Sequence, residues 1–181
     1  MVNNVLLPQD GFILKKSVIN QSGATSVDLD NIFDTTKDVY QIDINNVVGS
    51  ATASLNMQFL DSSGTLLTAS NYNYSIQSTE IVNARTNNNG NMTTSIQLLE
   101  TTTDEQVNCQ LLIFNPASTT FKTKGLMLGG NTKGSTGYGF ASGGFEYNAT
   151  DALRGIRLSL SSGTFSDCDI MCSVLATESA G

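Results

Sequence analysis

The stretch from Val39 to Ile76 constrains the fold of this chain most strongly, because apolar and polar residues alternate along two of its segments, VYQIDINNV and ATASLNMQFL. A period of two residues is typical of a β-strand with one buried face. The sequence therefore predicts an antiparallel sheet here, with one face in a core and the other in water. The residues predicted to lie in the core are Tyr40, Ile42, Ile44, Ala53, Leu55, Met57 and Phe59. The opposite face is rich in amides and suited to being covered by a neighbouring subunit; its residues are Gln41, Asp43, Asn45, Asn56 and Gln58.

Turn sequences divide the rest of the chain into short segments. Asp61-Ser62-Ser63-Gly64 supplies the Gly that a tight reversal needs at a positive φ. Ser161-Ser162-Gly163 divides the C-terminal block into two alternating runs, which predicts a second hairpin with Ile156 and Leu158 buried and Arg157 facing solvent or a subunit boundary. The polar cluster TNNNGN at 86–91 predicts an exposed loop tip.

The segments between these turns predict about eight to ten antiparallel strands and no helix. The expected fold class is all-β, an antiparallel two-sheet sandwich of jelly-roll type. Pro8 and the turn-like residues that follow it predict a short N-terminal arm over residues 1–11, and residues 12–181 are expected to form a single domain. A chain of 181 residues buries roughly 70% of its unfolded surface, which is enough for a real core.

Charge and hydropathy exclude two classes of partner. The formal net charge is -7, with 9 Lys and Arg against 16 Asp and Glu. Nucleic-acid affinity depends on Lys and Arg displacing counterions, so DNA and RNA are not expected partners. No run of eighteen apolar residues occurs, and the start MVNNVLLPQDG lacks the basic and apolar regions of an export signal. We therefore expect no membrane insertion.

The three cysteines are predicted to be inert core residues. Cys168 and Cys172 lie four residues apart on one face of a predicted strand, about 13 Å from each other and too far to bridge. Together with Cys109 they are interpreted as small buried apolar residues of a protein that folds in a reducing cytoplasm. A zinc site is not expected, because the chain has no His and no CxxC spacing.

A cluster of carboxylates raises the question of calcium. Its members are Asp28, Asp30, Asp34 and Asp38. An EF-hand loop would need Gly at its sixth position and Glu at its twelfth, and DLDNIFDTTKDV has neither. The default interpretation is that these carboxylates lie at turns and strand ends. A looser calcium site in a loop stays open as the alternative, and no cofactor is expected.

The segment from Gly129 to Phe145, GGNTKGSTGYGFASGGF, has the most unusual composition of the chain. It contains neither a phosphate-binding loop nor a complete dinucleotide-binding fingerprint. One interpretation is a hairpin whose aromatic residues pack on the sheet or on a neighbouring subunit. The other is an exposed aromatic surface that binds sugar rings together with asparagines. The candidate interaction residues are Asn88, Asn89, Asn131, Tyr138, Phe140 and Phe145.

Catalysis is not expected. Without His the chain has no Ser-His-Asp or Cys-His arrangement, and the cysteines lie in apolar alternation, which disfavours an activated thiolate. Paired carboxylates for glycoside hydrolysis stay open, because the sequence does not give the separation of about 5 to 9.5 Å that this chemistry requires.

Several of these segments together resemble small jelly-roll structural proteins of tailed bacteriophages, over roughly residues 38–175. The segments are YQIDINNV from Tyr40, FLDSSG from Phe59, YNY from Tyr72, LRGIRL from Leu153 and SSGTF ending at Phe165. The usual ending of that group, a Gly followed by a Leu-Tyr-Gly strand, is replaced here by Cys168–Ala176.

The resemblance implies a virion structural protein that is made in the host cytoplasm. The expected form is a capsid decoration protein or another surface-attached jelly-roll subunit, with partners that are copies of itself, as a homotrimer, and other capsid or tail proteins. The alternative is a tail-associated receptor-binding module that recognises a host-surface glycan. A bacterial surface or pilus-like module is the third interpretation, and the lack of an export signal counts against it.

Overall fold

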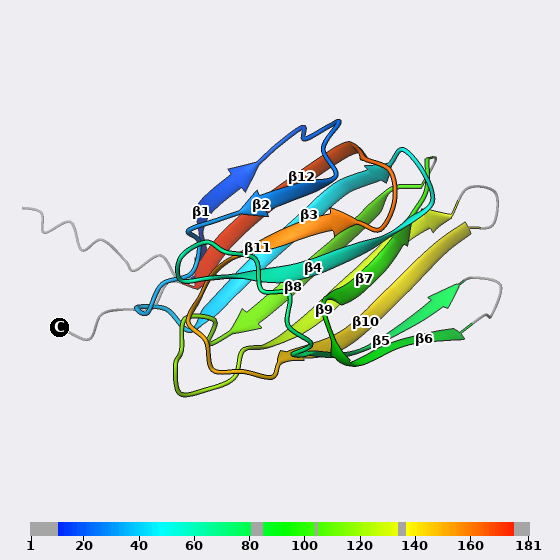
Figure 1. The fold of residues 1–181 in the computed structure, drawn as a ribbon. Coiled ribbons are helices and arrows are strands. Elements are labelled where there is room, and N and C mark those ends of the chain that lie inside the picture. Colours follow the sequence, from blue (N-terminus) through cyan, green and yellow to red (C-terminus); the bar gives the residue numbers. More distant parts are fainter. Residues whose placement is uncertain (1–10, 81–84, 104, 134–136, 176–181) are drawn as a thin grey trace, which may run out of the picture.

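The structure, a computed structural model, describes residues 11–80, 85–103, 105–133 and 137–175. These residues form twelve antiparallel strands in two sheets and no helix. Figure 1 shows how the strands are arranged. Four of the strands make up the smaller sheet, namely β2 (Ser26–Leu29), β4 (Ala53–Asp61), β7 (Ile96–Thr101) and β11 (Leu153–Leu160). Eight make up the larger sheet, namely β1 (Phe12–Val18), β3 (Val39–Gly49), β5 (Tyr72–Glu80), β6 (Arg85–Thr93), β8 (Val107–Phe114), β9 (Lys124–Lys133), β10 (Gly137–Tyr147) and β12 (Phe165–Leu175).

Eight of the strands form a jelly roll. The antiparallel pairs β1–β12, β2–β11, β3–β8 and β4–β7 are nested along the chain and folded into the sheets β1-β12-β3-β8 and β2-β11-β4-β7. Strands from opposite ends of the chain therefore lie side by side, as β1 and β12 do in Figure 1. Two sheets that close on each other in this way are the jelly-roll architecture, so the predicted fold class is confirmed.

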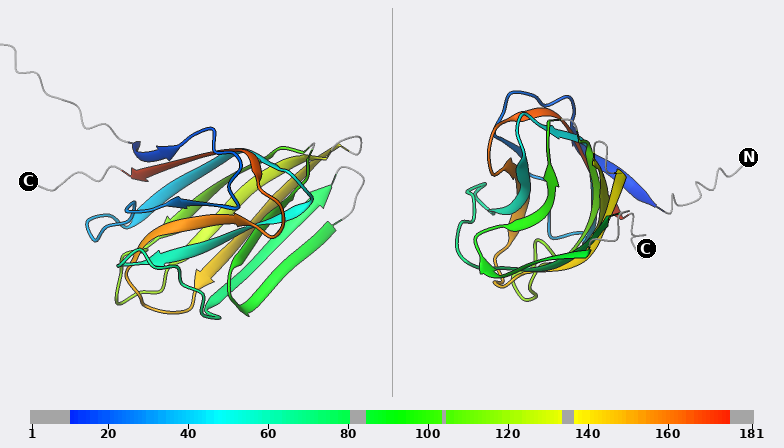
Figure 2. Two further views of the ribbon diagram at one scale, coloured as in Figure 1. Left: turned by 45° about the horizontal axis from the view of Figure 1, so that its top comes forward. Right: turned by 90° about the vertical axis from the view of Figure 1, so that its right-hand side faces the viewer.

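Two hairpins are inserted into this jelly roll. β5–β6 lies between β4 and β7 in the sequence, and β9–β10 lies between β8 and β11. Both hairpins join the same sheet, which reaches the order β1-β12-β3-β8-β9-β10-β5-β6, while the other sheet keeps four strands. The longer sheet curves, with the four-stranded sheet on its concave side (Figure 2). The inserted hairpins therefore extend past the smaller sheet.

The core lies between the sheets and confirms the predicted inner residues. Those with no exposed surface include Tyr40, Ile42 and Ile44 of β3 and Leu55, Met57 and Phe59 of β4. The predicted pairing of these strands in one sheet is wrong, because β3 pairs with β12 and β8, and β4 pairs with β11 and β7. Alternation identifies the buried face of a strand but not its partner strand. The inner faces of β3 and β4 contact the same core from opposite sheets.

In the C-terminal block, too, the predicted buried face is correct and the predicted strand partner is not. Ile156 and Leu158 are buried and Arg157 is partly exposed, so the predicted register of β11 is confirmed. The predicted β11–β12 hairpin is wrong, because β11 pairs with β2 and β4, and the chain then crosses to the other sheet. Gly163, with φ of 70°, makes the predicted turn at this crossing.

Two turn predictions have opposite outcomes. Gly64 has φ of 85° and its N–H donates to the Asp61 carbonyl at 2.9 Å, so the Asp61–Gly64 reversal is confirmed. The predicted loop tip at 86–91 is wrong, because these residues lie in β6 at the edge of the eight-stranded sheet. Polar side chains hold this strand to β5, with Ser78 Oγ 2.5 Å from Thr86 Oγ1. An edge strand tolerates such polar residues because one of its sides faces water.

The predicted burial of the three cysteines is confirmed. Cys109, Cys168 and Cys172 are all free and buried in the core. The predicted N-terminal arm lies outside the described residues except for Gly11. Within the described ranges, no helix has the length and apolar character of a membrane span.

Candidate functional site

The face of the eight-stranded sheet that points away from the smaller sheet, called the outer face here, carries exposed apolar side chains. Met127 of β9 points inward and is 3% exposed, whereas its neighbours Leu126 and Leu128 point outward and are 54% and 52% exposed. Phe140 of β10 is 46% exposed. Leu112 of β8 is half-buried and lies directly opposite Leu126. We call Leu112, Leu126, Leu128 and Phe140 the apolar strip.

Exposed apolar residues also lie at the β1 edge of the same outer face, separated from the apolar strip by Ser173 and Gln41. Cross-strand pairs place five outward residues in one row, from the edge strand β1 to β9: Leu14, Ser173, Gln41, Leu112 and Leu126. Leu14 is 58% exposed and its neighbour Phe12 is 41% exposed. Natural proteins usually protect exposed hydrophobic residues at a sheet edge from association with other chains.

Charged groups lie on two sides of the apolar strip, with the Lys124–Glu146 ion pair beyond Leu126 and Asp43 on the β3 side. Asp43 of β3 points outward, where its carboxylate accepts hydrogen bonds from Gln41 Nε2 at 3.0 Å and from Gln110 Nε2 at 2.9 Å. Gly144 lies opposite Leu126 and adds no side chain to the outer face. The centre of the face is therefore apolar, and amides surround it on the β3 and β8 side.

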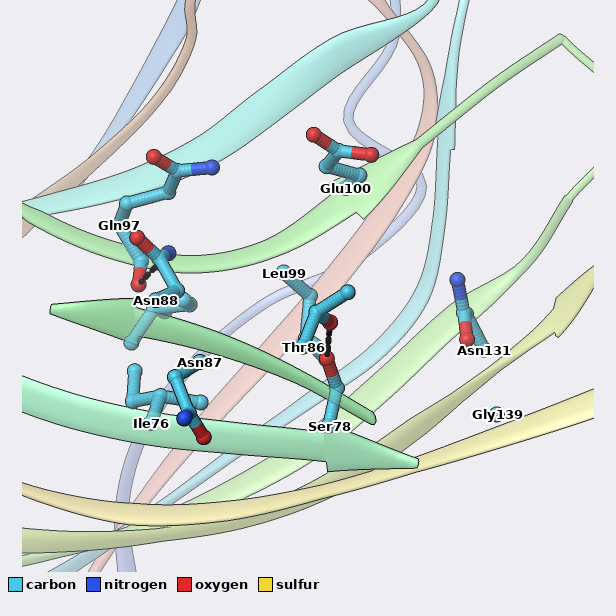
Figure 3. A pocket seen from close by; sticks show the side chains of 11 residues that line it. Ile76, Ser78, Thr86, Asn87, Asn88, Gln97, Leu99, Glu100, Asn131 and Gly139 are labelled. Atoms are coloured by element: carbon cyan, nitrogen blue, oxygen red, sulfur yellow. Dashed lines mark hydrogen bonds between the residues drawn. The ribbon is translucent and has the colours of Figure 1, made fainter. Parts of the chain in front are cut away.

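A second feature is an inter-sheet cleft of about 320 Å³, which lies where the inserted hairpins extend past the edge of β7. In Figure 3 Asn88 and Gln97 lie at one end of the cleft, Asn131 lies at the other, and Ser78 and Thr86 lie between them. The apolar part of the lining is buried and consists of Ile76, Leu98 and Leu99. The cleft thus combines an apolar surface with amide and hydroxyl groups.

Hydrogen bonds position the polar groups of the cleft. Asn88 Nδ2 donates to the Gln97 carbonyl at 3.3 Å, which joins edge strands of the two sheets. The Tyr74 hydroxyl donates to Asn88 Oδ1 at 3.5 Å. At the other end, the amide of Asn131 lies against Gly139, where a Cβ would approach Asn131 Oδ1 to 2.4 Å. Gly139 therefore makes room for that amide.

The structure separates the six candidate interaction residues. Asn88 and Asn131 are brought together in the cleft. Asn89 is exposed, and Phe140 belongs to the apolar strip on the outer face. Phe145 is 5% exposed and packs against Phe59 in the core, so it is not available to a ligand.

The sixth candidate, Tyr138, belongs to the Gly-aromatic segment Gly129–Phe145. The Tyr138 side chain lies outside the described residues, although its backbone pairs with that of Thr132. The segment forms parts of strands β9 and β10, as in the hairpin interpretation. Phe140 and Phe145 point to opposite sides of the sheet, so these two rings do not share one surface.

Three of the four carboxylates of the predicted cluster, those of Asp28, Asp30 and Asp34, are engaged by cations. Asp28 accepts two hydrogen bonds from Arg157 at 2.6 and 2.7 Å, and Asp30 accepts one from Arg154 at 2.9 Å. The Lys15 ammonium bonds to Asp34 and lowers the pKa of that carboxyl from 3.8 to about 2, with help from Thr36. Within the described ranges, no group of three or more Cys, Asp or Glu is placed to hold a metal ion.

Sequence reasoning named Phe140, Asn88 and Asn131 but missed the leucines of the apolar strip and the cleft that joins the two asparagines. Leu126 and Leu128 sit in a run, KGLMLGG, whose apolar residues do not alternate, so it gives no buried face. An available signal was that Leu112 and Phe114 lie on the face of β8 opposite its core residues. The cleft depends on strands β5, β6, β7, β9 and β10 meeting across two sheets, which no local pattern encodes.

These observations define the class of the protein as a jelly-roll β-sandwich with two hairpins inserted into one sheet. The chain matches no known protein-family model and no curated protein at a significant level.

Proposed function

We propose that the protein is a non-enzymatic structural subunit of a tailed-phage virion, a capsid decoration protein or another surface-attached jelly-roll subunit. It acts through contacts of its outer face with copies of itself, as a homotrimer, and with other virion proteins. The observation that carries this proposal is the apolar strip, which leaves Leu126, Leu128 and Phe140 about half exposed in the single chain.

Burial of the apolar strip gives a driving force for association. Complete burial of a Leu or Phe side chain is worth about 1.5–3 kcal/mol, and contiguous apolar patches on soluble proteins often mark interaction sites. Homodimer interfaces are more apolar than the remaining surface and are depleted of charge at their centre. The outer face has this character, with leucines at its centre and amides such as Gln41 and Gln110 beside them.

Charge distribution also favours contacts between copies. Two chains of net charge -7 repel each other unless the surfaces that meet are nearly neutral. Asp43, on the outer face, is hydrogen-bonded by two amides, and the ion pairs of Asp28 and Asp30 hold together strands of the other sheet and its loops. Asp169 and Glu146 also lie on the outer face. Asp169 accepts a hydrogen bond from Asn46, and Glu146 is paired with Lys122 and Lys124, so the carboxylates lie around the apolar strip rather than within it.

The experiment that tests the virion role is quantitative mass spectrometry of purified particles of the phage whose genome encodes the chain. The proposal predicts a fixed copy number, with hundreds of copies for a head decoration and a few dozen or fewer for a tail protein. Deleting the gene should weaken the particles. Absence of the chain from intact purified particles would overturn the proposal.

A further inference from the structure

We infer that the inter-sheet cleft is a binding site for a neutral saccharide. This inference does not depend on the outer face, because the cleft lies between the two sheets and uses different residues. The binding groups are amides and hydroxyls of β5, β6 and β7, with Asn131 of the Gly-aromatic segment at the far end.

The size and lining of the cleft suit one or two sugar rings. A volume of about 320 Å³ is at the lower end of the range for ligand sites, roughly 300–1,000 Å³. The apolar side chains of the lining, Ile76, Leu98 and Leu99, are 2%, 1% and 8% exposed, so they close the inner wall of the cleft and the polar groups make most of the contact with a sugar. Such a combination, apolar lining with a few oriented polar groups, is typical of small-molecule sites.

The polar groups of the cleft match the hydrogen bonding of sugar hydroxyls. Amides offer both donors and acceptors, and the hydroxyls of Ser78 and Thr86 do the same. Each sugar hydroxyl also donates and accepts, so the amides of Asn88 and Asn131 can bond to it in either direction. The Asn88 amide is already oriented by Gln97 and Tyr74, which reduces the entropy lost on binding.

Charge selects a neutral ligand over an anionic one. Among the described residues that line the cleft there is no Lys or Arg, and Glu100 contributes a carboxylate. Phosphate and carboxylate ligands are normally held by cationic side chains, so a nucleotide or an acidic sugar would meet an unfavourable field here. Glu100 is also the one carboxylate among those lining residues, whereas glycoside hydrolysis uses a pair, so the site binds without cleaving.

The test is an NMR titration of the isotope-labelled full chain with glucose, galactose and N-acetylglucosamine, and with N-acetylneuraminic acid as the anionic comparison. At least one neutral sugar should shift the amide signals of Asn88, Gln97 and Asn131, while the acidic sugar should not. Asn131→Ala should weaken binding about 3- to 10-fold, because one neutral hydrogen bond is lost.

Two further variants separate binding from folding. Asn89 lies beside Asn88 on the same strand but outside the cleft lining. The Asn89→Ala variant should therefore bind the sugar like the unmodified chain. Gly139→Ala places a methyl group against the Asn131 amide, which can turn away, so it should weaken binding without lowering the melting temperature. No shift with any neutral sugar, or equal binding by the Asn88→Ala and Asn89→Ala variants, would overturn the inference. Loss of sugar binding would leave the copy number in the virion unchanged.

Discussion

At the scale of single residues, the three cysteines show how burial controls chemistry. Cys109, Cys168 and Cys172 lie in the core, and burial raises the pKa of each thiol from 9.0 to about 12. The thiolate is the reactive form, and this shift leaves very little of it at neutral pH. These residues act as small apolar side chains.

The native protein should therefore resist thiol reagents. With Ellman's reagent at pH 8, we expect no release of chromophore from the folded chain and three equivalents after addition of guanidinium, because the chain contains three free thiols. Rapid labelling of even one cysteine before unfolding would show that the core around it opens, and would contradict this account of the three residues.

At the scale of strands, aromatic rings covering glycines explain part of the composition of the inserted hairpins. Phe145 of β10 is paired with Gly125 of β9, and a Cβ on that glycine would lie 2.0 Å from the ring. Tyr74 of β5 covers Gly90 of β6 in the same way, with a Cβ 2.1 Å from the ring. Both pairs let an aromatic side chain lie flat across its neighbouring strand, a device that fixes strand register.

Gly125→Ala should destabilise the fold. The added methyl group displaces the buried Phe145 ring, and overpacking of this kind typically costs about 1–3 kcal/mol. Guanidinium unfolding should show a lower midpoint with an unchanged slope. Gly144→Ala, on β10, is the control, because its Cβ would meet its nearest neighbour at 3.4 Å. Equal stability of the two variants would show that the Phe145–Gly125 contact does not support the hairpin.

The strands also show what local sequence encodes. Alternation in β3, β4 and β11 predicts the buried side chains, and Gly64 and Gly163 predict turns, because these features depend on neighbours along the chain. Strand partners do not follow from such patterns. The pairs β1–β12 and β2–β11 join segments from opposite ends of the chain, so the sheet assignment of β3 and β4 depends on contacts that no single segment contains.

At the scale of the whole molecule, the insertion of both hairpins into one sheet creates the two proposed surfaces. β9 and β10 bring Leu126, Leu128 and Phe140 to the outer face, and β5 and β6 extend past β7 to form one wall of the cleft. Two of the six predicted site residues, Asn88 and Asn131, reach the cleft together. Sequence could not show this, because β6 and β9 are separated by β10 and β5 in the sheet and by two other strands along the chain.

Self-association through the outer face can be tested directly by one measurement of the oligomeric state. Sedimentation equilibrium should be performed on the unmodified chain and on the Leu126→Asn/Leu128→Asn double variant. Both leucines are about half exposed, so their replacement should not disturb the fold. Phe121→Asn is the control, because Phe121 is 65% exposed but lies between β8 and β9, away from the apolar strip.

We expect the unmodified chain and the Phe121→Asn variant to sediment as a homotrimer. The double variant should sediment as a folded monomer, since it loses most of the apolar surface that the contact would bury. A monomeric unmodified chain at every concentration, or a double variant that sediments like the unmodified chain, would contradict assembly through the outer face.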